Sequence, residues 1–234
     1  MPLRSTSKHT LLLIAAASGA AFLLLAWSYV NGSPISRADL WVKELLQPLY
    51  QADVELLGRG LYWISFFGGS GLLFVAGVTS GYLAGRRDWA KLLLWLIMVV
   101  GVIVLNRLLK DLFVLTRPVV GQLDLLEDSS GFPSGHAMIA TATYGLLASL
   151  IAEHLSRDAL RWALWGVLGL LLGLIGFSRL YLSVHFLIDV VAGYAAGIAW
   201  LCLCLWVYQQ LAVPARVQQV AQSIAQRVLV RRPE

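Results

Sequence analysis

The pair of residues in this sequence best suited to nucleophilic chemistry is His185 and Asp189, which stand four positions apart at the start of a long apolar run. Residues at this spacing share one face of a helix, so the carboxylate is expected to lie against the imidazole ring. A hydrogen bond between them would fix the tautomer of the ring and leave its second nitrogen free to attack an electrophile. The same bond would offset the cost of placing an aspartate near lipid, which is on the order of 3 kcal/mol at mid-bilayer.

Three basic side chains, those of Lys110, Arg117 and Arg179, stand near the ends of apolar runs. The planar donor fork of an arginine suits phosphate oxygens, while a lysine acts as a point charge. A phosphoryl-transfer site must stabilise the charge on the oxygens of the transferring group. These three residues are therefore candidates for phosphate binding.

A helix is predicted to open at the segment Pro133-Ser134-Gly135-His136. Proline suits the first turn of a helix, and the N–H groups of such a helix start form an anion site. Gly135 would let a phosphate approach the backbone closely. The hydroxyl of Ser134 can donate one more hydrogen bond to the same anion.

The elements that must position these groups are membrane spans. Of the 234 residues, 59% are hydrophobic and only 13% are charged, against roughly 25% charged in soluble proteins. A membrane-spanning helix needs about 20 apolar residues. We therefore predict an all-α polytopic membrane protein, a single domain over residues 1–234, with six transmembrane helices at about 10–30, 61–84, 89–112, 134–153, 160–177 and 185–211.

Two further features of the spans can be predicted from the sequence. Residues 31–60 are expected to form a loop, with a weakly amphipathic segment at 38–57 lying on the membrane surface. Within the fifth span, small residues are expected to permit close helix packing, namely Gly166, Gly169, Gly173 and Gly176.

The orientation follows from the distribution of basic residues. The 3–4 and 5–6 connections of a six-span protein lie on one side, so all the polar groups above face one compartment. The opposite side is the richer in Lys and Arg, which marks the cytoplasm. We predict cytoplasmic termini, a cytoplasmic surface helix in the tail 212–234, and an active site at the outer membrane surface. The residues of the richer side are Arg4, Lys8, Arg86, Arg87, Lys91, Arg157, Arg161, Arg216, Arg227, Arg231 and Arg232.

Together the three polar segments resemble the signature of the type 2 phosphatidic acid phosphatase family, which also includes vanadium-dependent haloperoxidases. The family pattern K-x6-RP, PSGH and SR-x5-H-x3-D is complete within residues 110–189. The resemblance implies that His185 is the nucleophile and forms a phosphohistidine, that Asp189 orients it, and that His136 is the general acid and base. The implied phosphate-binding residues are Lys110, Arg117, Ser134, Gly135 and Arg179.

The resemblance and the topology predict a phosphatase of the bacterial inner membrane that acts on a lipid-linked phosphate or diphosphate. The candidate substrates are undecaprenyl diphosphate, phosphatidylglycerol phosphate and phosphatidic acid, held among membrane lipids. No cofactor is expected, and catalysis should be metal-independent because no carboxylate cluster accompanies the site. A nucleic-acid partner is not expected, because the net charge of +5 is spread over span ends and does not form one patch.

Two alternative functions stay open at this point. The first is a phosphotransferase that passes the phosphate to an acceptor lipid such as lipid A. The second is a non-catalytic lipid-phosphate binder or transporter, against which the complete set of His136, His185 and Asp189 argues. A haloperoxidase is disfavoured, because six apolar spans suit a lipid substrate. The sequence leaves open the choice among lipids, the oligomeric state and the role of residues 31–60.

Overall fold

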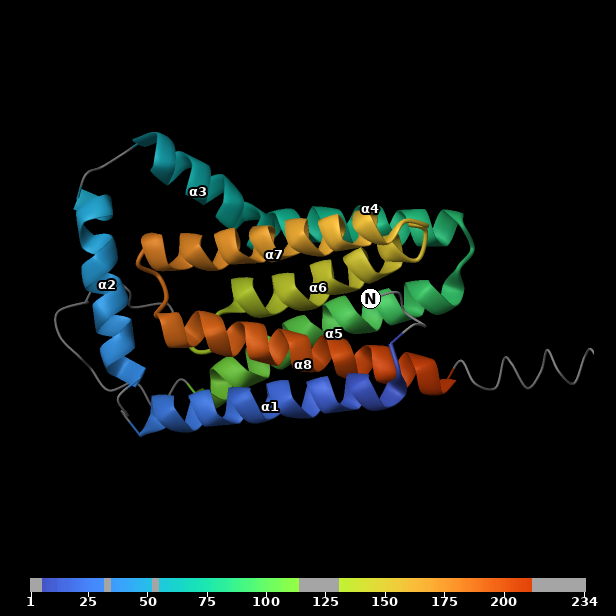
Figure 1. Ribbon diagram of the computed structural model, residues 1–234, viewed down its shortest axis with the longest axis horizontal. Helices are drawn as coiled ribbons and strands as arrows, with labels where there is room; N and C mark the ends of the chain where they lie inside the picture. Colours follow the sequence, from blue (N-terminus) through green and yellow to red (C-terminus); the bar gives the residue numbers. More distant parts are fainter. Residues whose placement is uncertain (1–5, 32–34, 52–54, 114–130, 212–234) are drawn as a thin grey trace, which may run out of the picture.

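The computed structural model describes residues 6–31, 35–51, 55–113 and 131–211. Within these ranges the chain is all-helical, as predicted, and Figure 1 shows the helices gathered in one bundle. The predictions made for Arg117 and for the tail 212–234 fall outside the described residues. The helices are α1 (Lys8–Val30), α2 (Ile35–Gln51), α3 (Glu55–Gly68), α4 (Ser70–Gly85), α5 (Trp89–Phe113), α6 (Gly135–Ala152), α7 (Asp158–Tyr181) and α8 (Leu187–Leu211).

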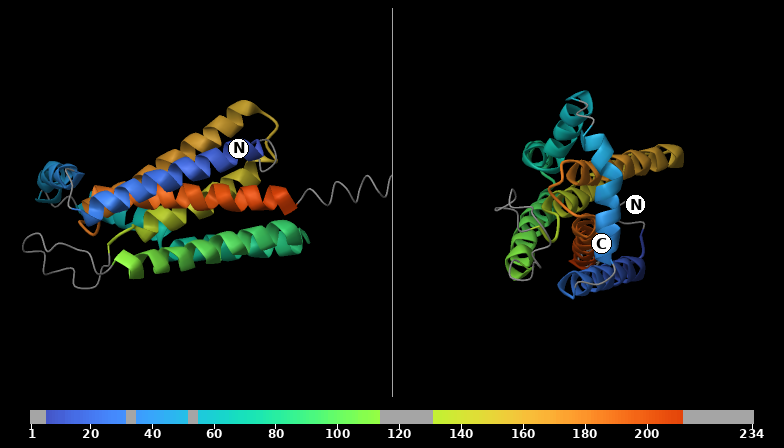
Figure 2. Two further views of the ribbon diagram at one scale, coloured as in Figure 1. Left: turned by 90° about the horizontal axis from the view of Figure 1, so that it is seen from below. Right: turned by 90° about the vertical axis from the view of Figure 1, so that its left-hand side faces the viewer.

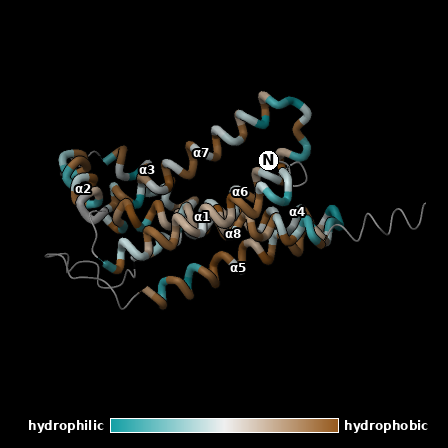
Figure 3. Tube along the Cα trace, turned by 60° about the horizontal axis from the view of Figure 1, so that its bottom comes forward, coloured by the Kyte–Doolittle hydropathy of each residue, from teal (hydrophilic) through white to brown (hydrophobic). Residues whose placement is uncertain are grey.

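The described part of the chain contains five or six candidate membrane spans, against the six predicted. Five single helices, α1, α5, α6, α7 and α8, are long and apolar enough to cross a membrane. The bent pair of α3 and α4 passes the same test only when the two helices are taken together as one span, which gives the sixth. Figure 3 shows the hydrophobic residues following the lengths of these helices. Hence the protein is an integral membrane protein. The predicted ends of two spans need correction, because α7 continues to Tyr181 and α8 begins only at Leu187.

The second span is not the single helix predicted over about 61–84. It consists of α3 and α4, which meet at Gly69 with a bend of 44°. The sequence at the bend is Gly68-Gly69-Ser70-Gly71, and glycine is among the weakest helix formers. The carbonyl of Phe67, on the last turn of α3, accepts a hydrogen bond of 2.7 Å from the hydroxyl of Tyr144 on α6. A backbone acceptor at the break is thus satisfied from a neighbouring helix.

Most of residues 31–60, predicted as a loop, is helical, and the amphipathic segment predicted at 38–57 falls in α2 and the first residues of α3, apart from 52–54. Its place on the membrane surface stays a prediction. The sequence from Ile35 to Gln51 contains no glycine and four leucines, which are strong helix formers. The helix includes Pro48 near its end. Figures 1 and 2 show α2 lying across the end of the bundle where α7 turns back into α8.

Helix α6 forms the centre of the bundle and is buried against α5, α7 and α8. Its contact with α8 is made by two glycines four residues apart, Gly193 and Gly197. A Cβ atom at Gly193 would stand 2.7 Å from the carbonyl oxygen of Ser134, and one at Gly197 would stand 2.6 Å from that of Met138. Glycine at both positions therefore lets the two backbones approach closely.

This finding corrects the packing role predicted for the glycines of α7. An added Cβ atom would meet nothing within 4 Å at Gly166, Gly169 or Gly173, and only Gly176 is closely packed, beneath the hydroxyl of Tyr194. Glycines recur along both α7 and α8, but only those of α8 form a tight interface, which they make with α6.

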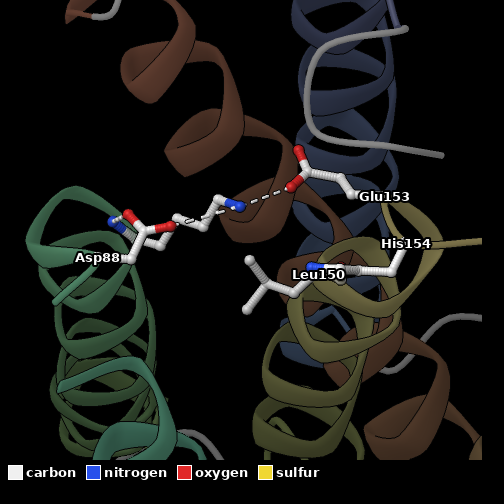
Figure 4. Close-up of polar contacts among 5 residues, drawn as sticks. Asp88, Leu150, Glu153 and His154 are labelled. Carbon is white, nitrogen blue, oxygen red and sulfur yellow. Dashed lines mark hydrogen bonds and ion pairs between the residues drawn. The ribbon is translucent and has the colours of Figure 1, made fainter. Parts of the chain in front are cut away.

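An ion pair ties α5 to α6 at the end of the bundle opposite α2. Lys91 Nζ lies 2.8 Å from a carboxylate oxygen of Glu153 and 3.5 Å from one of Asp88. The side chains of Lys91 and Glu153 are each about one-fifth exposed. Beside them, His154 Nδ1 lies 3.0 Å from the carbonyl oxygen of Leu150 (Figure 4). These charged and polar groups stand at the span ends, where water and headgroups can solvate them.

Alanine substitutions at two glycines should move thermal stability in opposite directions. Gly197→Ala should destabilise the protein by about 1–3 kcal/mol, because the new Cβ meets backbone that cannot move aside. Gly169→Ala should stabilise it by up to about 1 kcal/mol, because alanine is the better helix former and the site is open. Thermal unfolding of the two variants in one detergent measures the difference. Equal shifts would contradict the assigned α6–α8 contact.

Candidate active site

The pairing predicted for His185 and Asp189 is present. Nδ1 of His185 lies 3.4 Å from Oδ2 of Asp189, which also accepts a hydrogen bond of 3.0 Å from the backbone N–H of Phe186. Asp189 is fully buried, and the His185 side chain is only 6% exposed. His185 precedes the first residue of α8, and only Asp189 belongs to the helix. With Nδ1 held by the carboxylate, Nε2 is the ring nitrogen left for a ligand.

The turn between α7 and α8 returns His185 to the bundle. Helix α7 ends at Tyr181, and Ser183 adopts a left-handed backbone with φ of 55°. The N–H of Val184 donates to the carbonyl of Arg179, which closes the helix end. This is the usual way of ending a helix with one left-handed residue, here without the glycine that marks it in a sequence. The five-residue spacing from Arg179 to His185 is the length of this turn.

The segment that opens α6 is bonded directly to the His185–Asp189 segment. The backbone N–H of Ser134 donates to the carbonyl of Asp189 over 2.9 Å. Helix α6 begins at Gly135 with Ser134 as its N-cap. Pro133 thus lies before the N-cap and not in the first turn of the helix, which corrects the predicted placement. Helical geometry leaves the N–H groups of Gly135, His136 and Ala137 without intrahelical partners. Binding of an anion by these groups stays a prediction.

Aromatic rings hold this segment from the other side. Phe132, 1% exposed, stacks on Tyr29 of α1 with ring centroids 4.6 Å apart. It also meets Phe22 of α1 and, edge to face, Phe113 at the end of α5. Contacts of this kind add about 0.5–1.5 kcal/mol each beyond the burial of the rings. They connect α1 and α5 to the start of α6.

Asn106 on α5 lies beside Gly135. A Cβ atom at Gly135 would stand 2.9 Å from Oδ1 of Asn106, a side chain that is itself buried. The observed close approach at this glycine is therefore made by Asn106. The phosphate contact predicted for Gly135 stays a prediction.

Two of the three predicted phosphate-binding cations lie near both histidines, and the third, Arg117, is outside the described residues. Arg179 on α7 and Lys110 in the last turn of α5 are close enough for their charges to act on both His136 and His185. Nη1 of Arg179 donates a hydrogen bond of 2.6 Å to the hydroxyl of Ser65 on α3. Among the described residues, Nε of Arg179 and the hydroxyl of Ser134 are buried without a hydrogen-bond partner. Buried donors are rarely left unpaired, so each of these two groups is a candidate donor to an anionic ligand.

The break between α3 and α4 forms the wall behind His136. A Cβ atom at Gly69 would stand 2.9 Å from Nε2 of His136, and one at Gly68 would stand 3.1 Å from Cδ2 of the same ring. The ring thus packs on bare backbone. Sequence reasoning did not identify Ser65, Gly68 or Gly69 as site residues. The run of glycines at 68, 69 and 71 was the one signal that this span differed from the others.

Burial lowers the pKa of His185 below its ordinary value of 6.5. The positive charges of Arg179 and Lys110 act in the same direction, while the hydrogen bond and the charge of Asp189 oppose it. A lowered pKa keeps the imidazole neutral at pH 7, and only the neutral ring has a lone pair for attack. Among the described residues, no three His, Cys, Asp or Glu side chains stand together as metal ligands.

Comparison with known proteins identifies the class to which this bundle and site belong. Phosphatidylglycerophosphatase B of Bacillus subtilis is 32% identical over 180 residues, which are 76% of this chain and 86% of that protein. Lipid A 4'-phosphatase of Porphyromonas gingivalis is 34% identical over 68 residues, 29% of this chain and 25% of that protein. The crystal structure of a transmembrane PAP2-type phosphatidylglycerolphosphate phosphatase from Bacillus subtilis superposes with a TM-score of 0.67 at 26% identity, covering 84% of this chain and 96% of that one.

The fold and the site thus define an integral membrane protein similar to a bacterial membrane phosphatase. The PAP2 superfamily matches residues 89–212, which is more than half of the chain. The chain belongs to the PAP2 superfamily, and the resemblance seen in the three polar segments is confirmed.

Replacement of Ser134 by alanine should separate ligand binding from stability. The unpartnered hydroxyl costs about 1–3 kcal/mol when the site is empty, so Ser134→Ala should raise the melting temperature. It should also reduce the extra stabilisation given by added inorganic phosphate, because a donor to the anion is lost. Thermal unfolding with and without phosphate measures both effects.

The matched control is Thr143→Val, deeper in the same helix. The Thr143 hydroxyl is also buried and unpartnered within the described residues, so its removal should stabilise the protein without changing the response to phosphate. A similar phosphate response in wild type and Ser134→Ala would contradict the role of Ser134 in anion binding.

Proposed function

We propose that this protein is a lipid phosphate phosphatase in which His185 is the nucleophile. The observation that carries the proposal is the buried contact of His185 with Asp189, close to Arg179, Lys110 and His136. A neutral imidazole oriented by a carboxylate, with cations for the phosphate oxygens, supplies the groups that phosphoryl transfer requires. Membership of the PAP2 superfamily and similarity to two lipid phosphatases support the same reaction.

The proposed reaction has two steps. Nε2 of His185 attacks phosphorus, a P–N bond forms, and the P–O bond to the leaving group breaks. His136 takes up a proton from solution when the bound phosphate dianion offsets the nearby positive charges, and it donates that proton to the leaving oxygen. Water then attacks phosphorus, the P–N bond breaks, and His136 takes the proton of that water. The products are the dephosphorylated lipid and inorganic phosphate. No step calls for a metal ion, so we propose metal-independent hydrolysis.

Phosphatidylglycerol phosphate is the first substrate to test. The Bacillus subtilis relative that matches 76% of this chain is named as a phosphatase of this lipid. Undecaprenyl diphosphate and phosphatidic acid are the alternative substrates. A lipid substrate fits the site because the histidines stand at the ends of membrane spans, level with lipid headgroups. The acyl chains would remain in the bilayer while the phosphate enters among Ser134, His136 and Arg179.

Phosphate release by detergent-purified protein in EDTA tests this function. Wild type should release phosphate from at least one of the three lipids, and His185→Ala should lose on the order of 10³-fold or more in kcat, as expected when a nucleophile is removed. His154→Ala, at the opposite end of the bundle, should be unchanged. Loss of activity in EDTA that added metal restores would contradict metal independence.

Product analysis separates hydrolysis from phosphotransfer. A transferase would move phosphate to an added acceptor such as lipid A without accumulating free phosphate. Binding of the lipids without any product would instead indicate a non-catalytic binder.

The activity should persist into mildly acidic solution. Because the pKa of His185 is lowered, the acid limb of kcat/KM should lie below pH 6.5, with activity falling only as the ring takes up its proton. Asp189→Asn removes a charge that raises this pKa, so the limb should move to still lower pH, with a lower maximal rate. An acid limb above 6.5 in wild type would contradict the assignment of His185.

We further propose that the site faces the outside of a bacterial inner membrane, with both termini in the cytoplasm. Variants with one added cysteine test this orientation, because Ser183 and Asp158 are exposed near opposite ends of α7 and the native Cys202 and Cys204 are buried. A membrane-impermeant maleimide added to intact cells should label Ser183→Cys and not Asp158→Cys. The reverse labelling would place the site in the cytoplasm.

A further inference from the structure

The N-terminus of α8 is capped by a residue from a distant helix. Oδ1 of Asp39, on α2, accepts a hydrogen bond of 3.0 Å from the backbone N–H of Ile188, which lies 149 positions further along the chain. The N–H of Leu187 also interacts with this carboxyl group. Asp39 is only 8% exposed. Its carboxyl group therefore points into the bundle and not into solvent.

Helix α8 needs this contact, because the residues at its own start satisfy only one of its free N–H groups. The first N–H groups of any helix lack intrahelical partners and are usually satisfied by a side chain just before the helix. Here that residue is Phe186, which has no acceptor in its side chain. The carboxylate of Asp189 satisfies the N–H of Phe186. Asp39 satisfies the next ones, so two carboxyl groups share one helix start.

The shared helix start is the one that holds the proposed nucleophile. Asp189 lies in the first turn of α8 and contacts His185, while its carbonyl accepts from Ser134. A change in the first turn would therefore move the carboxylate that orients the ring. Asp39 touches neither His185 nor Ser134 in any hydrogen bond of the described residues, so its influence would pass through α8.

The position of α2 is suited to this role. The helix lies across the site end of the bundle (Figures 1 and 2) and contacts α1, α7 and α8. Its outward stripe, Trp41, Leu45 and Leu49, is exposed, while Asp39 lies on the side that meets the bundle. Burial, and after it the neighbouring charge of Asp189, raises the pKa of Asp39 to about 6 although the N–H groups of Ile188 and Leu187 lower it. The two acids are thus close neighbours.

We propose that Asp39 is a positioning residue of the active site, which holds the first turn of α8 and thereby the His185–Asp189 pair. The inference rests on the proposed function in one respect, the assignment of His185 as the nucleophile that Asp189 orients. It assigns a role to α2, since this helix carries the cap. The acceptor oxygen, and not the charge, is the essential feature, because a second negative charge beside Asp189 is repulsive.

Kinetics of three full-length variants test the proposal with phosphatidylglycerol phosphate, or with whichever of the three lipids wild type hydrolyses fastest. Asp39→Ala should lower kcat by about 10- to 100-fold, the range expected when a reacting group is slightly misplaced, with KM nearly unchanged. Asp39→Asn keeps an acceptor oxygen and should restore most of the rate. Glu44→Ala removes an exposed carboxylate of the same helix and should behave as wild type. Equal kcat in wild type and Asp39→Ala would overturn the proposal.

Hydrogen exchange provides a readout that does not depend on catalysis. Asp39→Ala should speed exchange of the amides at 187–190 while leaving those within α6 protected, and Asp39→Asn should not. Unchanged exchange at 187–190 in Asp39→Ala would overturn the proposal even if wild type hydrolysed none of the lipids. Loss of protection throughout the bundle would also overturn it, because Asp39 would then be a general stability residue.

Discussion

The burial of Asp189 is the constraint on which the site depends. A carboxylate that is fully buried near the membrane is tolerated only when partners surround it. Here the ring of His185 and the N–H of Phe186 meet Oδ2, while Oδ1 has no hydrogen-bond partner among the described residues. The position at the first turn of α8 adds the favourable end of the helix dipole. These same contacts orient the imidazole. The interaction that makes the buried acid tolerable is therefore also the one that prepares the ring for reaction.

The second constraint is the close packing of α6 on α8. Glycines at 193 and 197 let the backbones approach, and the N–H of Ser134 can then reach the carbonyl of Asp189. Two segments that lie some fifty residues apart in sequence become one rigid unit that carries both histidines. Apolar packing alone would not select this register, because lipid tails are as apolar as the helix surfaces. Small residues and polar contacts supply the specificity.

The broken second span completes the site from the other side. The bend at Gly69 brings bare backbone against His136 and places Ser65 of α3 beside Arg179. A straight helix with side chains at these positions would occupy the space of the imidazole ring. The glycines weaken the helix, but their missing side chains leave space for the ring of His136. The hydroxyl of Tyr144 on α6 satisfies a backbone carbonyl at the break. Together with α2, this span surrounds a site whose signature residues all come from elsewhere in the chain.

The sequence by itself determined where apolar helices could cross a membrane, because twenty apolar residues in a row have few other stable states in a bilayer. It also determined the pairing of His185 with Asp189, which are close in the chain, and the common side of the three polar segments, which follows from parity. The tertiary structure alone decided the contributions of Ser65, Gly69 and Asp39. These residues act on partners more than sixty positions away, and no local periodicity reports such contacts. The α7 glycines show the converse, since a small-residue pattern says that a helix can pack closely but not which neighbour it will meet.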